Sequence, residues 1–481
     1  MKLTAYAGAS DLSSVRRSLS AVRQAGSPSM STTPRTTSRP AVGLLAAMLW
    51  TTVSIARAQQ APQHTGLSSA DSLIRVGEDR AVIINARGLA TIEPHLAADA
   101  RDPNHLLGGV SLVARLGDPR NPNFAMDMSC AALDSRDAGQ TWVRRDFAPQ
   151  GCGDPWVALV GGGAVFLGLT RGRLVALRSM DGGRTWADSA VNLGSGDHGT
   201  LVVDTTRSPF TGSVYAVWWA PVRDDRGSSR SAVLVARSAD GGATFSSPTR
   251  IVPWSVRSVA MNPAVLSDGR LVVPFNSLLS KSSPTWVVTS LDGGRTFSVP
   301  LLVTDVCGRS FSQLSVDASP GPYRDRLYFV CSDSSHVYLL LSSDRGETWS
   351  DPLVVNRGPG PVHNPVIAVN RRGVVAISWY DAREDPRSYR DSFRCQHVFF
   401  AASLDGGSTV LPDVKVSSAE NCPDTPANGE AGARWKAGGD YHGLAAAADG
   451  RFHLVWADSR EGIYQLRTAR IEIGRDAGPP R

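Results

Sequence analysis

Six copies of one eight-residue pattern, Ser-x-Asp-x-Gly-x-Thr followed by a bulky residue, run through this chain of 481 residues. The copies begin at Ser135, Ser179, Ser238, Ser290, Ser342 and Ser403. Successive starts are 44, 59, 52, 52 and 61 residues apart, which is close to the length of one four-stranded propeller blade. The chain is therefore built from a repeated supersecondary unit.

Each copy has the chemistry of a tight turn. The Asp side chain accepts hydrogen bonds from backbone N–H groups just after it, and the Gly adopts the left-handed conformation that such a turn requires. The last residue is Trp or Phe in five copies and Val410 in the sixth, and we expect it to plug into the core. The pattern thus predicts structural turns that take no part in chemistry.

This pattern is the Asp box, and the chain resembles the sialidase-like family of Asp-box (BNR repeat) β-propellers over about residues 72–474. The resemblance implies an all-β fold of four-stranded antiparallel blades. It implies glycans or glycoconjugates as partners, although propellers of this kind carry several activities. The boxes lie away from the usual site of the family.

The sequence between the boxes predicts the number of blades. Seven segments begin with a polar residue and continue as an apolar inner strand, and they open at Glu93, Asp154, Asp197, Asn262, Ser312, Asn364 and Asp440. We therefore predict a β-propeller of seven blades, with six as the alternative. The last unit lacks a box, so we expect an N-terminal strand, residues 72–76 or 81–85, to complete it and close the ring.

The first 58 residues have the features of a secretory leader. An apolar run from Ala41 to Ala56 follows basic residues and precedes a small-x-small site at Ala56-Arg57-Ala58. The run is too short for a stable membrane span. We predict a leader over residues 1–58, a linker over 59–71, the propeller over 72–474 and a flexible tail over 475–481. Met30 is an alternative start of translation.

Cysteine usage and charge agree with export. Six cysteines lie beyond the leader, and their order suggests three local disulfides, Cys130–Cys152, Cys307–Cys331 and Cys395–Cys422, although fifteen connectivities exist. The net charge of +6 equals that of the leader alone, so the basic pI does not indicate a nucleic-acid partner. We expect a secreted or periplasmic monomer.

Candidate site residues lie where the inner strands begin, because these positions ring one mouth of the central channel. Substrate-binding candidates from this set are Asp154, Asp197, His198, His363 and Asp440. The family resemblance adds Tyr441 as the nucleophile, Asp127, in the loop between the second and third strands of the first blade, as the acid/base, and Arg394 as one of three arginines that bind the substrate carboxylate.

Two departures from the family pattern concern sialidase chemistry. The early Arg-Ile-Pro of the family is replaced by Ile92-Glu93-Pro94, which puts a carboxylate where the carboxylate of the substrate would bind. The mid-chain Glu that would activate Tyr441 has no counterpart between Glu93 and Glu347. A phenol is a poor nucleophile without such help, so we expect little or no cleavage of a sialoside.

Two functions and one cofactor remain open from the sequence. The first function is a diverged exo-sialidase-type glycoside hydrolase, in which channel carboxylates including Glu93 act as acid and base on a neutral sugar. The alternative is a non-catalytic propeller that binds a glycan or a protein. No cofactor is required, but four acids, Glu93, Asp154, Asp197 and Asp440, provide the oxygen ligands that Ca²⁺ prefers.

Overall fold

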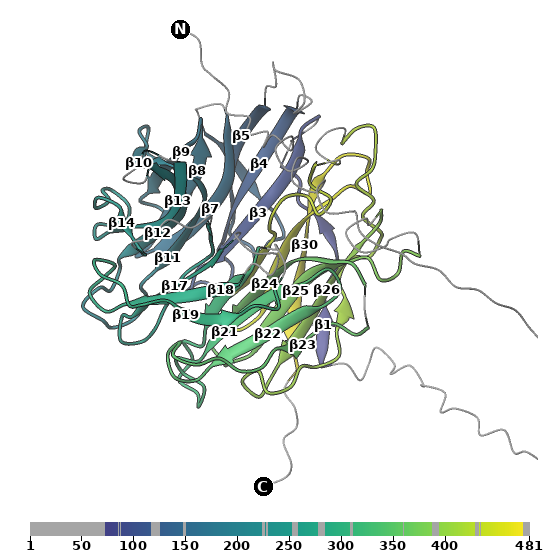
Figure 1. Cartoon of the computed structure of the whole chain (residues 1–481). Coiled ribbons are helices and arrows are strands. Elements are labelled where there is room, and N and C mark those ends of the chain that lie inside the picture. The colour runs from purple at the N-terminus through teal and green to yellow at the C-terminus, as the bar shows by residue number, and fades with distance from the viewer. Residues whose placement is uncertain are drawn as a thin grey trace, which may run out of the picture. The chain divides into compact units, whose positions relative to one another are not determined.

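The computed structural model of this chain describes a β-propeller (Figure 1). It describes residues 73–116 except Asn85 and Arg87, then 126–147, 151–223, 227, 229–252, 258–277, 284–307, 311–358, 360–386, 394–428, 432 and 434–474. The predicted leader, linker and tail lie outside these residues and stay predictions.

Seven antiparallel sheets form the blades, as the seven inner-strand openings predicted. The inner strands are β3 (Ala90–Ala98), β7 (Cys152–Val160), β11 (Asp197–Val203), β15 (Ser258–Ala260) with β16 (Ala264–Val265), β20 (Gln313–Val316), β24 (Val362–Val369) and β28 (Gly443–Ala446). The second strands are β4 (Leu106–Leu116), β8 (Gly163–Thr170), β12 (Val214–Arg223), β17 (Leu271–Ser277), β21 (Leu327–Ser332), β25 (Val375–Asp381) and β29 (Phe452–Asp458).

Third and outer strands complete each sheet. The third strands are β5 (Met126–Ser135), β9 (Arg173–Ser179), β13 (Ser229–Ser238), β18 (Thr285–Ser290), β22 (Val337–Ser342), β26 (His397–Ser403) and β30 (Gln465–Ile473). The outer strands of the first six blades are β6 (Val143–Asp146), β10 (Val191–Ser195), β14 (Thr249–Arg250), β19 (Leu301–Thr304), β23 (Leu353–Val354) and β27 (Val414–Lys415).

An N-terminal strand occupies the outer position of the seventh blade. β1 (Ile74–Val76) pairs antiparallel with β30, and β2 (Arg80–Ala81) pairs with a more N-terminal part of the same strand. The last sheet thus combines both ends of the described propeller chain, and these two short strands fall in or beside the two predicted segments. The ring is also joined at the inner strands, where the Glu93 amide donates to the Gly438 carbonyl at 2.9 Å.

Each eight-residue repeat forms the same hydrogen-bonded turn after a third strand. In the fourth copy, Ser290 Oγ donates to Asp292 Oδ1, and the backbone N–H and hydroxyl of Thr296 donate to the two oxygens of Asp292. The Asp–Thr contacts recur in the other five copies. The repeat therefore shapes the blade edge.

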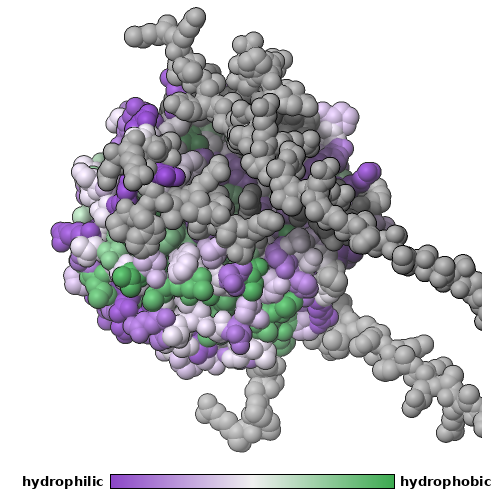
Figure 2. Space-filling model, in the orientation of Figure 1, coloured by the Kyte–Doolittle hydropathy of each residue, from purple (hydrophilic) through white to green (hydrophobic). Residues whose placement is uncertain are grey.

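The core is apolar and lies between blades. The largest fully buried side chains include Trp218, Trp379 and Trp456, which lie in second strands and pack between sheets. Trp379 and Trp456 also donate their indole N–H to Asp381 and Asp458. These tryptophans are therefore packing residues of the core. On the surface, hydrophobic side chains are interspersed with hydrophilic ones (Figure 2).

All three predicted disulfides are present. Cys130–Cys152 joins the first blade to the second, and Cys307–Cys331 joins the fourth to the fifth. Cys395–Cys422 links the segment just before β26, within the sixth blade, to the segment that follows β27. Among the described residues, no helix is long and apolar enough to cross a membrane.

Candidate functional site

A strained backbone position recurs where inner strands begin. Glu93, Asp154, His198 and Asn364 hold equivalent places in four blades, and their φ angles are 54°, 50°, 50° and 49°. Each lies within a register shift between its inner strand and the second strand. Such a left-handed conformation costs a non-glycine residue about 1–3 kcal/mol, and strain of this kind clusters at functional sites.

Glu93 is the most buried acid of this ring, with 2% of its surface exposed. Its Oε2 accepts hydrogen bonds from Ser111 Oγ at 3.1 Å and from the Asp154 amide at 3.3 Å. Burial, with the Asp440 carboxylate nearby, raises the pKa of Glu93 to about 7. Glu93 is therefore mostly neutral below pH 7 and about half ionised at pH 7.

His198 links two carboxylates at the more open side of the cluster. Its Nε2 lies 3.2 Å from Asp440 Oδ2, and its Nδ1 lies 3.5 Å from Asp197 Oδ2. About a third of each carboxylate side chain is exposed, as is 21% of the His198 side chain. These three groups are thus the part of the cluster that a ligand can touch.

The environment separates the protonation states of the acids. Burial and the Glu93 carboxylate raise the pKa of Asp154 well above its usual value. Burial alone would raise the pKa of Asp197, but hydrogen bonds from His198 and Asp154 lower it to about 2. Neighbouring carboxyl groups whose pKa values are pushed apart are typical of acid–base sites.

His198 has two hydrogen-bonding states. Burial acts to lower its pKa, but hydrogen bonds to Asp197 and Asp440 raise it well above the ordinary value. In the neutral ring, Nε2 donates to Asp440 while Nδ1 accepts from the Trp219 indole N–H at 3.1 Å. A proton added at Nδ1 displaces the Trp219 contact and is shared with Asp197. The ring is therefore placed to gain and lose a proton.

Tyr441 is buried and engaged in a structural contact. Its hydroxyl donates to the Pro155 carbonyl at 3.0 Å, and its ring packs edge-on against Trp156. Burial, together with the carboxylates of Glu93 and Asp154, raises the pKa of Tyr441 well above its usual value. The phenolate that a nucleophile needs is thus strongly disfavoured here.

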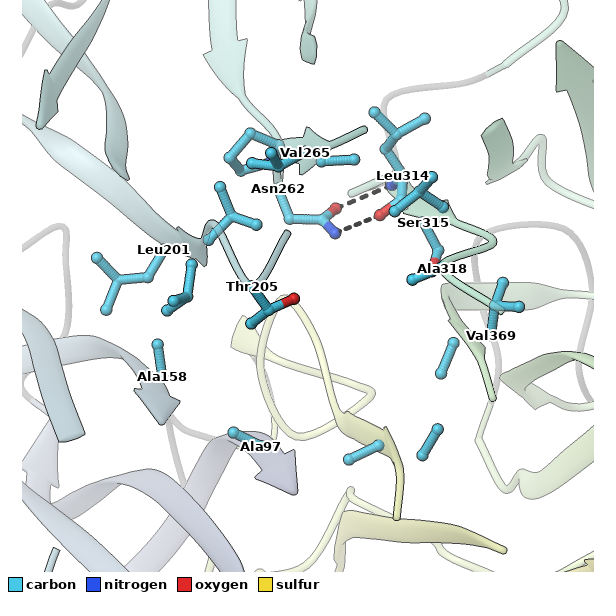
Figure 3. Close-up of a pocket in the computed structure, with 18 of the residues that line it drawn as sticks. Ala97, Ala158, Leu201, Thr205, Asn262, Val265, Leu314, Ser315, Ala318 and Val369 are labelled. Atoms are coloured by element: carbon cyan, nitrogen blue, oxygen red, sulfur yellow. Dashed lines mark hydrogen bonds between the residues drawn. The ribbon is translucent and has the colours of Figure 1, made fainter. Parts of the chain in front are cut away.

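Aromatic rings pack beside the cluster. His95 stacks on Trp156 with ring centroids 3.8 Å apart, and Phe311 stacks on His198 at 4.8 Å. His95 and Trp156 also line a cavity of about 530 Å³, part of whose lining is shown in Figure 3. Its lining is mainly Ala, Val and Leu, and the Asn262 side chain bonds to the Leu314 backbone there. The cavity and the acid cluster are therefore distinct.

Three other predicted site residues lie elsewhere or have a different environment. Asp127 is exposed and lies in β5, so the prediction that it belongs to a loop was wrong, because the β4–β5 ladder extends to the Arg115–Asp127 pair. Arg394 is exposed and precedes Cys395. His363 lies in β24, where burial lowers its pKa to about 4. Their roles stay predictions.

Several contacts of the cluster escaped the sequence analysis. Ser111 and Trp219 come from second strands, where alternation predicted only packing, and Phe311 precedes an inner strand. One signal was visible in the sequence: the Gly438-Gly439 pair directly before Asp440. Glycine pairs mark close backbone approaches, and a Cβ atom on Gly439 would clash with Glu93 Cγ.

Asp154, Asp197 and His198 offer possible metal-ligand atoms within 4.8 Å of one another. Calcium prefers six to eight oxygen ligands, whereas this group includes an imidazole and an acid that favours its protonated form. Glu93 Oε2 already accepts two hydrogen bonds. The Ca²⁺ site suggested by the sequence stays a prediction.

Comparisons with known proteins agree with the fold. Residues 205–356 match the family model described as a BNR repeat-like domain. No curated protein sequence matches the chain.

Solved structures similar to the chain include a Dyadobacter fermentans protein of unknown function, with 13% identity, TM-score 0.47 and coverage of 83% of this chain and 99% of that one. The Ruminococcus gnavus intramolecular trans-sialidase is 14% identical, with a TM-score of 0.42 and coverage of 82% of this chain and 97% of that one. A Fusarium graminearum GH93 α-L-arabinofuranosidase is 11% identical, with a TM-score of 0.44 and coverage of 64% of this chain and 93% of that one.

Proposed function

We propose that this sialidase-like BNR β-propeller is a glycoside hydrolase that acts on a neutral glycan through the cluster around His198. The observation that carries the proposal is the His198 ring held between Asp197 and Asp440, with the neutral acids Glu93 and Asp154 behind it. The resemblance to sialidase-like propellers supports a glycan as the partner class.

The proposed chemistry assigns two tasks to the exposed side of the cluster. Protonated His198 donates a proton to the glycosidic oxygen as the bond to the anomeric carbon breaks, and the oxygen of a water molecule then forms the new bond to that carbon. The ionised Asp197 stabilises the positive charge that develops on the sugar ring. His198 regains its proton from the attacking water.

Electrostatics favour a neutral sugar over a sialoside. The strongest charged neighbours of Glu93, Asp154, Asp197 and Tyr441 are carboxylates and His198, with no arginine among them. A substrate carboxylate about 4 Å from an unpaired like charge loses about 4 kcal/mol at an effective dielectric constant of 20. An anionic substrate is therefore disfavoured at this mouth.

We also propose that the protein acts outside the cytoplasm. The support is the three disulfides, because such bonds persist in oxidising compartments. N-terminal sequencing of protein recovered from the culture medium or periplasm tests whether residues 1–58 are removed.

The test of the proposed activity is a panel of fluorogenic glycosides that includes neutral sugars and one α-sialoside. We expect turnover of a neutral glycoside, reduced about 100-fold or more in His198→Gln and Asp197→Asn. Asp146→Asn, an exposed acid on β6, should keep the activity. Robust sialoside cleavage abolished by Tyr441→Phe would contradict the proposal, and glycan binding without turnover would favour the binding propeller instead.

A further inference from the structure

The segment that carries Asp440 is fixed by two neighbouring blades. The Gly438 carbonyl accepts the Glu93 amide at 2.9 Å, and the Gly439 carbonyl accepts the Asn364 side-chain amide at 2.8 Å. These successive carbonyls belong to the seventh blade, whereas Glu93 lies in the first and Asn364 in the sixth. The backbone just before Asp440 is thus held from both sides.

The backbone geometry of this segment leaves little freedom. Gly438 and Gly439 both have positive φ angles, 68° and 117°, and Gly439 packs directly against Glu93. Asn364 is 9% exposed and itself has a φ of 49°. Asparagine tolerates this conformation better than most residues, so the strand keeps a rigid amide donor at the one place that faces the Gly439 carbonyl.

We infer that Asn364 is a positioning residue that holds the Asp440 carboxylate against His198. The path runs from the Asn364 amide to the Gly439 carbonyl, and through one peptide unit to Asp440, whose Oδ2 lies 3.2 Å from His198 Nε2. Asn364 itself has no part in proton transfer. The consequence for turnover rests on the proposed function, whereas the effect on His198 does not.

Another contact of the same kind supplies a matched control. Asn370, just past the other end of β24, donates its side-chain amide to the Gly450 carbonyl of the seventh blade at 2.7 Å. Asn370 is also buried and its Oδ1 accepts two backbone amides. Asn370→Ala therefore removes one hydrogen bond between the sixth and seventh blades, as the loss of the Asn364 side chain does. The bond lost in Asn370→Ala lies at the opposite end of β24 and far from Asp440 along the sequence.

The experiment is an NMR titration of the His198 ring in the full-length protein, labelled selectively at histidine. The test variant is Asn364→Gly, because glycine accepts the left-handed backbone and removes only the amide. We expect the pKa of His198 to shift down toward about 6.5 in Asn364→Gly and to stay at the wild-type value in Asn370→Ala. The kcat of a glycoside substrate should fall about tenfold to 100-fold with little change in KM.

Two further variants make the outcome decisive. Asp440→Asn should lower the pKa of His198 directly, and adding Asn364→Gly to it should have no further effect if the two act through one path. Asn364→Ala removes the same amide and keeps a Cβ atom, at a cost of about 1–2 kcal/mol in the left-handed backbone, and it provides the same test should Asn364→Gly fail to fold. An unchanged His198 titration in Asn364→Gly, or an equal shift in Asn370→Ala, overturns the inference. Absence of turnover on every glycoside would contradict the proposed function, but the His198 titration could still be measured and would still test the inference.

Discussion

At the scale of single residues, Glu93 shows how position and environment together determine chemistry. The sequence places this acid where the resembling family has an arginine, and the structure encloses it beside Ser111 and the Asp154 amide. The carboxyl therefore favours its neutral form, with a pKa of about 7. A neutral Glu93 limits the repulsion among the acids of the cluster.

This environment predicts a pH-dependent contribution to stability. Because the pKa of Glu93 is raised from 4.5 to about 7 in the folded state, its contribution is fully present below about pH 4.5 and is lost as the pH rises through 7. The free energy of unfolding of the wild type, minus that of Glu93→Gln, should fall by up to about 3 kcal/mol across this window. Chemical denaturation at pH 4.5 and pH 8 measures it.

The subtraction is necessary because buried histidines act in the opposite direction. Burial lowers the pKa of His95 and His442 to about 3, so their contribution is lost as the pH falls below 6.5. The wild type and Glu93→Gln share this loss, so it cancels when the two free energies of unfolding are subtracted. Glu347→Gln, an exposed acid within a repeat, should show no such pH-dependent difference. If Glu93→Gln behaves like Glu347→Gln, Glu93 is not a buried neutral acid.

The sequence identified five members of the cluster at this scale, because polar residues that open inner strands converge on one channel mouth. It did not predict their protonation, which depends on burial and on distances between blades. Tyr441 illustrates the limit. Its position resembles the nucleophile of the family, whereas its bond to the Pro155 carbonyl can be seen only when two blades are brought together.

At the scale of elements, the Asp box could be predicted in detail because its interactions are local. Every hydrogen bond of the turn joins residues at most four positions apart. The inner strands were predictable for a similar reason, since each prediction rests on a polar residue followed directly by an apolar run. The start of β5 was not, because the length of the β4–β5 ladder depends on pairing between distant residues.

The box turn predicts a defined mutational effect. Asp292→Ala removes the acceptor for Ser290 and for the N–H and hydroxyl of Thr296, and we expect a loss of about 1–3 kcal/mol in the free energy of unfolding. Burial acts to raise the pKa of Asp292, but the hydrogen bonds from Thr296 and Ser290 together outweigh it and lower the pKa to about 2. The stabilisation is therefore present above pH 3.8 and is lost as the pH falls through 2.

Urea denaturation at pH 7 measures the loss. Asp351→Ala, an exposed acid just outside a box, serves as the control and should change stability little. The titration of His198 should be the same in Asp292→Ala as in the wild type. A shifted His198 pKa in this variant would show that the boxes do take part in the site.

At the scale of the whole molecule, closure of the ring depends on contacts between the two ends of the propeller chain. β1 and β2 both pair with β30, and between them Asp79 is buried, with 3% of its side chain exposed. The sequence predicted that an N-terminal strand completes the last blade, because the last unit lacks a box. It gave no sign of the charge cluster at Asp79.

This cluster allows ring closure to be tested by one substitution. Asp79 accepts hydrogen bonds from Arg467 Nε at 2.6 Å and from the Ser418 amide and hydroxyl at 2.8 Å, and it lies 3.0 Å from Arg460 Nη2. Asp79→Ala leaves two partly buried arginines without this acid, so we expect a loss of about 3–5 kcal/mol. Glu78→Ala, which breaks only the exposed pair with Arg80, should cost less than about 1 kcal/mol.

Urea denaturation gives the two free energies, and limited proteolysis shows whether the segment of β1 and β2 is released first. Hydrogen bonds from Ser418 and Arg467 outweigh burial and lower the pKa of Asp79, so the difference between the two variants should be present above pH 3.8 and shrink in stronger acid. Because blades pack only on their neighbours, opening this seam exposes the edges of the first and last blades. If Asp79→Ala is no less stable than Glu78→Ala, the N-terminal segment covers the last blade without holding the ring closed.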